Sequence, residues 1–157
     1  MASLTVAAAE MKKVARDIRK LDKNALNLTT VWRRAGSRIA RDNRRQFATK
    51  GAFQGTPWKP LAKSTLKQKL AKGYKRQMLR RTDELFRSYT GRPMGVEIIN
   101  PRDAHFGSGL MKAIWQEQGT FMNGKRHIPP RPIQKLNAAT KKEIIDMVVK
   151  HVMRGIG

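Results

Sequence analysis

Few side chains in this sequence have the type and spacing that catalysis requires. Asp83 and Glu84 are adjacent, so on a helix their carboxyl groups point in different directions and do not form an acid–base pair. Asp103 and His105 lie two residues apart in a glycine-rich segment, but no Gly-x-Ser-x-Gly motif accompanies them to supply a nucleophile. The acidic and imidazole groups therefore predict no catalytic residue, and we expect a protein that is not an enzyme.

Metal and cofactor chemistry is disfavoured by the same inventory. The chain has no cysteine, which excludes disulfides, thiolate metal ligands and cysteine nucleophiles. His105, His127 and His151 are widely spaced and form no HExxH-like pattern. No Gly-x-x-x-x-Gly-Lys-Ser/Thr loop is present to hold a nucleotide phosphate. We therefore expect neither a metal ion nor a cofactor.

The chemistry that the sequence does support is anion binding. Lysine and arginine total 34 residues against 11 acidic ones, for a formal net charge of +23. The segment from Arg44 to Arg81 contains 12 of these cations and no acid. Such a surface attracts polyanions. We expect the partner to be nucleic acid, an acidic protein surface or anionic lipid, and no apolar run is long enough for a transmembrane helix.

The cations that could carry this contact fall into three groups. Six arginines occupy one side of a predicted helix over residues 29–48, five lysines lie in the basic segment that follows, and two arginines flank a proline-rich stretch. The candidates for an interface or polyanion-binding site are Arg33, Arg34, Arg38, Arg41, Arg44, Arg45, Lys63, Lys67, Lys69, Lys72, Lys75, Arg126 and Arg131.

A proline-rich corner surrounds one of these arginines. Proline at 129, 130 and 132 fixes φ and excludes helix before Ile133, so the stretch predicts a rigid entry into a C-terminal helix. Arg131 stands among these prolines, and its planar five-donor head suits a bidentate clamp on a carboxylate or on carbonyl groups. This clamp would act as an internal brace between sheet and helix, or as a contact to a neighbouring subunit. Trp58, between two further prolines, is predicted to lie in a fixed extended segment.

The N-terminal elements are indicated by one long apolar repeat. Its steps alternate between four and three, which keeps the residues on one helical face: Ala7, Met11, Val14, Ile18, Leu21, Ala25, Leu28, Trp32, Ala35 and Ile39. Asp22-Lys23-Asn24 and Thr29-Thr30 are possible breaks, because these residue types cap helices readily. We predict two helices, over about 3–22 and 29–48, whose stripe packs into a core or a helix–helix seam.

The remaining segments predict a mixture of short helices and strands. Short helices are expected over 64–73, capped by Ser64, and after Thr82, which would cap a second one. Residues 94–99 alternate like a strand, residues 109–120 are ambiguous between strand and helix, and Asn123-Gly124 is a strong hairpin signal. From Gln134 onward the pattern is helical again. The expected fold class is α+β in a single domain over 1–157, with a helical part at 1–50 and a mixed part at 53–157.

An ordered set of short motifs resembles a known family. The motifs are PWKPLAKSTLKQK (57–69), LRRTDELFRSYT (79–90), GVEIIN (95–100), AIWQEQGT (113–120) and HIPPRPIQKLN (127–137). Together they are similar to the virion morphogenesis, or tail completion, proteins of tailed bacteriophages. Asp83 stands where the family pattern usually has glycine, and Ile133 stands where an aromatic residue is common.

The resemblance implies a structural virion protein that joins the tail to the DNA-filled head. It implies a homo-oligomeric ring, of roughly six or twelve subunits, at the neck or head–tail junction, after assembly in the host cytoplasm. The implied partners are other copies, neighbouring neck, connector or tail-terminator proteins, and the phosphates of packaged DNA. The N-terminal repeat and the hairpin are the candidate faces.

Two other functions compete with this interpretation. A basic protein without a sequence-reading motif could bind DNA nonspecifically through its phosphates. An antitoxin or small nuclease would need catalytic residues that the sequence does not offer.

Overall fold

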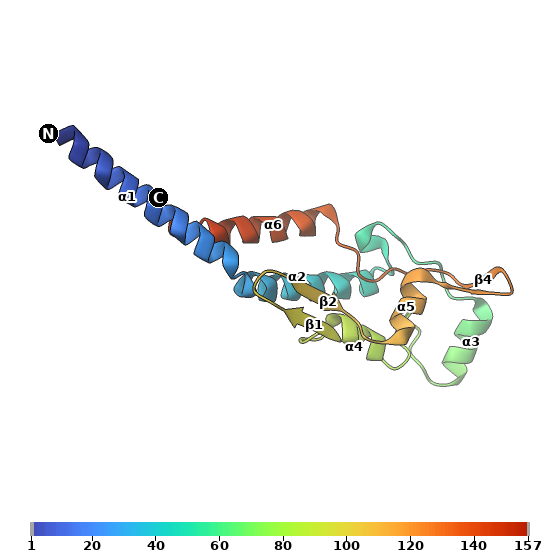
Figure 1. Ribbon diagram of the computed structural model, residues 1–157. Helices are drawn as coiled ribbons and strands as arrows, with labels where there is room; N and C mark the ends of the chain where they lie inside the picture. Colours follow the sequence, from blue (N-terminus) through green and yellow to red (C-terminus); the bar gives the residue numbers. More distant parts are fainter. Residues whose placement is uncertain (1, 157) are drawn as a thin grey trace.

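The computed structural model describes residues 2–156, with side chains for 10–125 and 127–156, and its fold class is α+β (Figure 1). In chain order the elements are α1 (Ala2–Leu26), α2 (Thr29–Ala48), the 3₁₀ turn η1 (Ala52–Gln54), α3 (Lys63–Ala71), α4 (Glu84–Thr90), β1 (Val96–Ile99), β2 (Ala104–Gly107), α5 (Met111–Gln118), β3 (Thr120–Met122), β4 (Lys125–Ile128) and α6 (Ala138–Val152). Helix α1 projects from one end, and α3 lies at the other. The molecule is therefore elongated.

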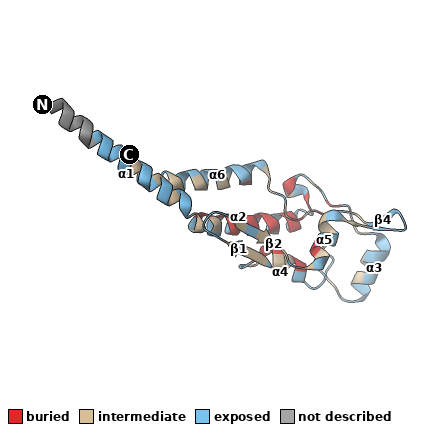
Figure 2. Cartoon of the chain, viewed as in Figure 1, coloured by how far each residue is buried: buried red, intermediate tan, exposed pale blue. Residues whose placement is uncertain are grey.

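Helix α2 is the centre of the body, and α4, α6, η1 and β1 pack around it. Its apolar positions form two clusters. One joins Phe47 to Trp58, Leu85, Tyr89, Ala113 and Ile133, and the other joins Ile39 and Ala40 to Met94. Rings stack edge to face within the first cluster, with Phe47 5.6 Å from Trp58 and 5.1 Å from Phe86 between centroids. Figure 2 shows that burial concentrates along α2 and is sparse on α1.

Buried polar side chains connect α2 to distant parts of the chain. The Asp42 carboxylate accepts from the Thr140 hydroxyl at 2.5 Å and from Arg38 Nε at 3.1 Å. The Asn43 amide donates to the Tyr89 carbonyl at 3.0 Å. The Gln46 amide donates to the carbonyl of Pro132 at 3.1 Å, and its oxygen accepts from a backbone N–H of η1. Because a buried polar group without a partner is costly, these contacts fix the positions of α4, α6 and the proline corner around α2.

The two N-terminal helices form as predicted, but the break between them lies later than expected. Helix α1 continues through Asp22-Lys23-Asn24 to Leu26, and α2 begins at Thr29. The Asn24 amide does not cap α1, because it donates to the carbonyls of Val152 and Arg154 at the end of α6, both at 3.1 Å. The prediction that α1 ends at residue 22 was wrong because the capping residue is used across the fold.

The predicted side-chain caps of the two short helices are wrong as well. Helix α3 begins at Lys63 with Ala62 at the capping position, so Ser64 lies inside the helix. Helix α4 begins at Glu84, and Asp83, not Thr82, occupies the capping position, without a side-chain capping hydrogen bond. Both helices are nevertheless where the sequence predicted them.

Two separate two-stranded antiparallel sheets complete the described fold. Strand β1 pairs with β2 so that Val96 lies opposite Gly107, and β3 pairs with β4 through the predicted Asn123-Gly124 turn. Both turn residues have positive φ, 50° and 71°, as a two-residue hairpin loop of the primed type requires. The segment that was ambiguous is helix α5. Gly119 ends α5 with φ +78°, and a Cβ there would lie 2.5 Å from the carbonyl oxygen of Ile128, so α5 and the hairpin meet at this glycine.

The last helix begins at Ala138, four residues after the predicted start at Gln134. Its N-cap is Asn137, whose side chain accepts from the backbone N–H of Thr140 at 2.8 Å. Upstream, the backbone N–H of Gln134 donates to Glu117 and that of Lys135 donates to the side chain of Gln54. These tertiary hydrogen bonds hold residues 133–137 in an extended conformation, so the helical periodicity of the sequence begins before the helix does.

Candidate interaction surface

The arginine side of α2 forms as predicted, with two members engaged inside the protein. Arg33, Arg34 and Arg41 are exposed, and no ion pair or hydrogen bond among the described residues involves their side chains. Arg38 is partly buried between Asp42 and Glu143 and forms ion pairs with both. Arg44 donates to the carbonyl of Thr90 at 2.9 Å while remaining exposed. Arg45 is exposed and lies 5.6 Å from the ring of Phe53.

The predicted lysines gather at the opposite end of the molecule from α1. Lys63, Lys67 and Lys72 are exposed on or beside α3, and Lys69 is half-buried. A cleft of about 400 Å³ lies between α3 and the start of α4, and its cationic lining includes Lys69, Lys72, Arg81 and Lys112. We call α3 and the residues up to 83 the basic lobe. The lobe could receive an anionic group in this cleft.

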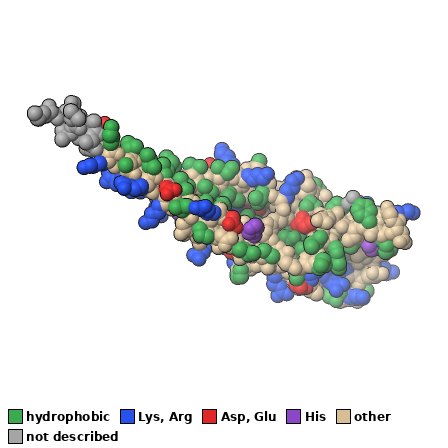
Figure 3. Space-filling model, viewed as in Figure 1, with side chains coloured by type: hydrophobic (Ala, Val, Ile, Leu, Met, Phe, Trp, Pro, Cys, Tyr) green, Lys and Arg blue, Asp and Glu red, His purple; other side chains and the backbone are tan. Residues whose placement is uncertain are grey.

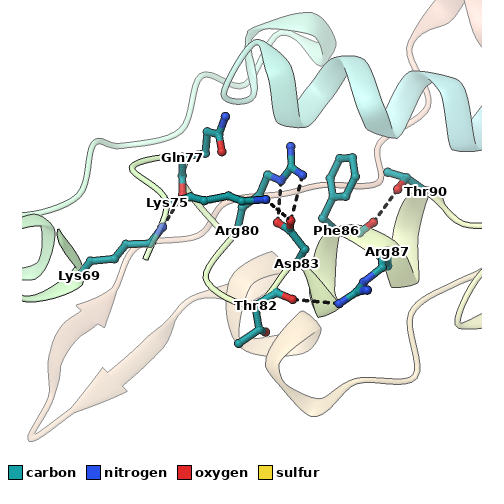
Figure 4. Close-up of polar contacts among 9 residues, drawn as sticks. All are labelled: Lys69, Lys75, Gln77, Arg80, Thr82, Asp83, Phe86, Arg87 and Thr90. Carbon is teal, nitrogen blue, oxygen red and sulfur yellow. Dashed lines mark hydrogen bonds and ion pairs between the residues drawn. The ribbon is translucent and has the colours of Figure 1, made fainter. Parts of the chain in front are cut away.

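Asp83 organises the basic lobe where the chain turns into α4 (Figure 4). Its carboxylate accepts from Lys75 at 2.7 Å and from Arg80 at 2.8 Å. Hydrogen bonds from Arg80 and then Lys75 hold the pKa of Asp83 well below its usual range. Asp83 has a left-handed backbone, with φ 59°, which glycine adopts most readily. Asp83 therefore adopts the bend for which the family pattern uses glycine. Lys75 and Arg80 hold its side chain in place.

Arg80, Arg81 and Lys69 also contact other parts of the lobe, through aromatic rings or a backbone carbonyl. The guanidinium of Arg80 lies 4.0 Å from the centre of the Phe86 ring, and that of Arg81 lies 5.3 Å from the Tyr74 ring. The Lys69 ammonium donates to the carbonyl of Gln77, and burial lowers its pKa. Arg80 and Lys69 therefore serve the lobe's own structure, as does the exposed Lys75 through its ion pair with Asp83, whereas Lys63, Lys67 and Lys72 are exposed.

The proline corner closes around Arg131, which is an internal brace. Arg131 is only 5% exposed, and its Nε and Nη2 atoms both donate to the carbonyl of Lys59 at 3.2 Å. Its Nη1 atom lies 3.4 Å from the side-chain oxygen of Gln116, and burial lowers its pKa. The predicted bidentate clamp on a carbonyl is confirmed. The clamp joins the corner to the Trp58 segment and α5, however, and not to the C-terminal helix, and its buried head cannot contact a partner.

Trp58, Pro129, Pro130 and Pro132 lie around this brace as one structural corner. Trp58 is buried, and its indole N–H donates to the carbonyl of Pro132 at 2.9 Å, the same oxygen that Gln46 contacts. Pro129 is half-buried and Pro130 is exposed. The side chain of the remaining candidate, Arg126, lies outside the described residues.

One half-buried carboxylate, that of Glu117, was missed by the sequence reasoning. The Oε1 atom of Glu117 accepts from the Tyr89 hydroxyl at 3.0 Å, the Ile133 N–H at 3.0 Å and the Gln134 N–H at 3.2 Å. Burial, and then the charge of Glu117, raise the pKa of Tyr89. The available signal was the acidic residue in AIWQEQGT, a segment otherwise free of acids. The carboxylate locks the proline corner onto α4 and α5.

Large apolar side chains are exposed on three helices. On α1 they are Met11, Val14 and Ile18; on α5 they are Met111, Ile114 and Trp115; on α6 and at its C-cap they are Ile145, Val149 and Met153. Within each set, residues three or four apart lie on the same side of the helix: Met11, Val14 and Ile18, then Met111 with Ile114 and with Trp115, then Ile145, Val149 and Met153. Figure 3 shows apolar side chains along one edge of α1 and cations along the opposite edge. Such faces are typical of surfaces that another protein covers.

Two other kinds of site, membrane-spanning helices and metal centres, are absent from the described residues. No helix there combines the length and the apolarity needed to cross a bilayer. No cluster of three or more histidine, aspartate or glutamate side chains there has the arrangement of a metal site. Asp103 and His105, which the sequence set side by side, lie 3.3 Å apart on the surface.

Comparison with known proteins places the chain in a family. Searches of the curated proteins and of the solved structures found no significant match. The sequence model of the phage virion morphogenesis family matches residues 9–153, which includes α2 to α6 in full and α1 from residue 9 onward. The chain therefore belongs to the phage virion morphogenesis family.

Proposed function

We propose that the protein is a structural, non-enzymatic component of the phage head–tail interface. It forms a homo-oligomeric ring at the neck, as a tail-completion protein, and joins the tail to the DNA-filled head. Its neighbours in the virion are connector, neck or tail-terminator proteins. The family membership supports a part in virion morphogenesis, and the position at the neck follows from the resemblance of the motifs to tail-completion proteins.

The observation that carries the proposal is the exposure of apolar side chains on α1. Met11 is 72% exposed, Val14 56% and Ile18 59%, on a helix that projects from the body (Figure 2). Fully burying a side chain of this size stabilises a contact by about 1.5–3 kcal/mol. A protein that works alone would gain nothing from this stripe, whereas a ring subunit can cover it.

The cations supply the second half of the proposed mechanism. The exposed arginines of α2 and the lysines of the basic lobe lie on different parts of the surface, so they can contact two different partners. We assign them to acidic surfaces of the flanking rings or to the phosphates of the last-packaged DNA. Contacts of this kind depend strongly on ionic strength.

A complementation experiment tests this mechanism. Arg33→Glu, Arg34→Glu and Arg41→Glu are combined in one variant, because these arginines have no structural role within the body. Arg102→Glu, Lys141→Glu and Lys142→Glu make the same change of charge at other exposed positions and serve as the control. We expect the first variant to reduce the count of joined head–tail particles in electron micrographs and the control to retain it.

Two outcomes would contradict the proposal. Normal joining and normal DNA retention in the α2 variant would remove the role of the arginine face. Absence of the protein from purified tailed particles would remove the head–tail function as a whole. The protein could instead be found as a monomer that binds duplex DNA with an affinity that falls steeply with salt and that binds no particle component. That result would favour a nonspecific DNA-binding protein.

A further inference from the structure

The cleft between α3 and the start of α4 combines an apolar wall with a cationic rim. Its volume of about 400 Å³ lies in the range that is usual for ligand sites. Leu61, Leu79 and Leu85 line it. Leu85 belongs to the core cluster around Phe47, and Leu79 packs against that cluster. The apolar wall is therefore an outer surface of the core, and the packing beneath it fixes its position.

The rim of the cleft carries cations that no carboxylate neutralises by direct contact. Lys69, Lys72 and Arg81 line the cleft, and none of them forms an ion pair with another described residue. Glu84 is the one acid among the described residues of the lining, and Lys112, which also lines the cleft, forms an ion pair with it. The charge that the cleft offers to a ligand is therefore positive.

The basic lobe itself holds two of these cations in place. Lys69 donates to the carbonyl of Gln77, and Arg81 lies 5.3 Å from the centre of the Tyr74 ring, which also lines the cleft. Burial lowers the pKa of Lys69; the charge of Asp83 opposes this shift in part, and that of Arg81 adds to it. The Lys69 ammonium therefore loses more hydration in the cleft than its surroundings replace, and a carboxylate brought into the cleft would replace it.

An apolar wall below a cationic rim distinguishes an acidic protein segment from DNA. The backbone of DNA is charged along its whole length, so phosphates on the rim would leave the three leucines uncovered or would lose hydration against them. An extended acidic segment with one large apolar side chain matches both parts, because the side chain covers the leucines while flanking carboxylates face the cations. A second copy of this chain is disfavoured by charge, since lysine and arginine outnumber the acids by 34 to 11.

We propose that the cleft binds a short acidic segment of another protein. A leucine-like side chain of the segment lies against the three leucines, and its carboxylates pair with Lys72 and Arg81. The inference deepens the proposed function, on which it rests for the source of the segment, a protein of a flanking ring. Because the cleft lies at the end of the molecule opposite to α1, the segment and a neighbour that covers α1 can bind at the same time (Figure 1).

Peptide titration of the full-length protein tests both halves of this chemistry. The probe is a fluorescently labelled peptide with one leucine between two pairs of glutamates, and its binding is followed by fluorescence anisotropy. Replacing the leucine by serine keeps the charge and should raise the dissociation constant about tenfold, because one apolar side chain is no longer buried. Replacing the glutamates by glutamines keeps the leucine and should also weaken binding. No binding of the leucine peptide, or equal affinity for the leucine and serine peptides, would overturn the proposal.

Variants of the cleft locate the bound peptide. Lys72→Gln with Arg81→Gln removes two exposed cations of the rim and should weaken binding about tenfold. Lys141→Gln with Lys142→Gln makes the same change of charge at exposed positions of α6, outside the cleft, and should leave the affinity unchanged. Thr65→Trp, at an exposed position of α3 that lines the cleft, fills the space while keeping every charge, and it should weaken binding as well. Full affinity in both cleft variants, with native circular dichroism, would contradict the proposal.

An oligonucleotide separates the acidic segment from DNA. A duplex oligonucleotide is titrated against the same variants, and we expect filling of the cleft to weaken binding of the leucine peptide more than binding of the duplex. If the rim variant and Thr65→Trp both weaken binding of the duplex more than that of the peptide, the cleft holds phosphates and the proposal is wrong.

The two proposals can fail separately. If the leucine peptide does not bind in the cleft and the protein is present in joined head–tail particles, the peptide site is wrong while the head–tail function stands. If the peptide binds as expected but the protein is absent from tailed particles, the peptide site is correct and the proposed position in the virion is wrong.

Discussion

Helices α1 and α2 carry the same apolar repeat, yet one is exposed and the other forms the core. Ile18 and Ile39 lie on the same face of the repeat, three heptads apart, and are 59% and 5% exposed. Four elements pack against α2, whereas the main contact that α1 makes among the described residues is with α6. The spacing of apolar residues therefore predicts a helix face that must be covered, but does not say whether the cover comes from the same chain.

Three polar residues of α2 contribute to the difference. On α2 the intervening Asp42, Asn43 and Gln46 are neutral amides or a single acid, and each finds a hydrogen-bond partner far along the chain. On α1 the intervening positions are charged, as at Glu10 and Arg19. Long charged side chains remain at the edges of a contact that forms and separates in water, whereas amides and short acids tolerate permanent burial when they are paired.

The largest expected effect comes from truncating the same residue type in both helices. Ile39→Ala should lower the free energy of unfolding by about 2–5 kcal/mol, because it opens a cavity beside Met94 in the core. Ile18→Ala should change it by less than about 0.5 kcal/mol in the monomer, because the side chain is already in water. Urea denaturation at low protein concentration measures both values.

For association of the subunits we expect the opposite order of effects. Ile18→Ala should weaken association of the folded protein, and sedimentation should show this at concentrations where the wild type is oligomeric. Equal destabilisation of the monomer by the two substitutions would mean that α1 is covered within its own chain. The two helices would then not differ in burial.

The buried contacts around α2 also predict a dependence on pH. The pKa of Tyr89 is raised above its ordinary value near 10, so the fold favours the protonated phenol. Its contribution to stability is complete below about pH 10 and is lost as the pH rises above that value. Thermal unfolding of wild type between pH 8 and 11 should therefore show a fall that is smaller in Tyr89→Phe. The difference between the two proteins isolates Tyr89 from the many lysines, and equal slopes would exclude the raised pKa.

Local patterns in the sequence were sufficient for much of this architecture. Helical periodicity predicts the arginine side of α2, and Asn123-Gly124 predicts the β3–β4 turn. The three prolines predict the rigid corner. Each of these signals depends on residues a few positions apart. The fold class, the helix at α2 and the hairpin could therefore be predicted.

Features that depend on distant partners could not be read from local patterns. Asn24 looks like a cap for its own helix but bonds to the end of α6, and Gln134 looks helical but its N–H is held by Glu117. Arg131 could have been an internal brace or a contact to a neighbour, and the structure shows its head buried against Lys59. For Asn24 and Gln134, the side chain or backbone group could bond either to a neighbour in the sequence or to a residue far along the chain. In the structure it bonds to the distant residue. The sequence named the candidate cations but could not divide them into structural and exposed ones.

A smaller effect is expected where α1 joins the body. Asn24→Ala removes two hydrogen bonds to the carbonyls at the end of α6, and a net loss of about 1–2 kcal/mol is expected. Because Asn24 lies where α1 contacts α6, the loss should appear as faster amide hydrogen exchange in α1 and at the end of α6. Exchange in α2 should not change. If α2 exchanges faster as well, α1 and α2 unfold as one cooperative unit. The contrast between an exposed α1 and a core α2 would then not extend to their local stability.

The smallest effect is expected at Asp83, at the edge of the covered region, where α4 begins its packing on α2. Asp83→Gly loses the ion pairs with Lys75 and Arg80 but relieves the left-handed backbone, so the two changes oppose each other. Asp83→Ala loses the same ion pairs and keeps the strain. The melting temperature should therefore decrease in the order wild type, Asp83→Gly, Asp83→Ala. The pKa of Asp83 is lowered, so the contribution of its ion pairs is present above about pH 4 and disappears as the pH falls further. In acid the wild type should therefore melt near Asp83→Ala, because both keep the left-handed strain, whereas Asp83→Gly should melt above both. If Asp83→Ala melts no lower than Asp83→Gly, the bend does not need a residue suited to positive φ, and the body around α2 tolerates change at its edge as readily as α1 does.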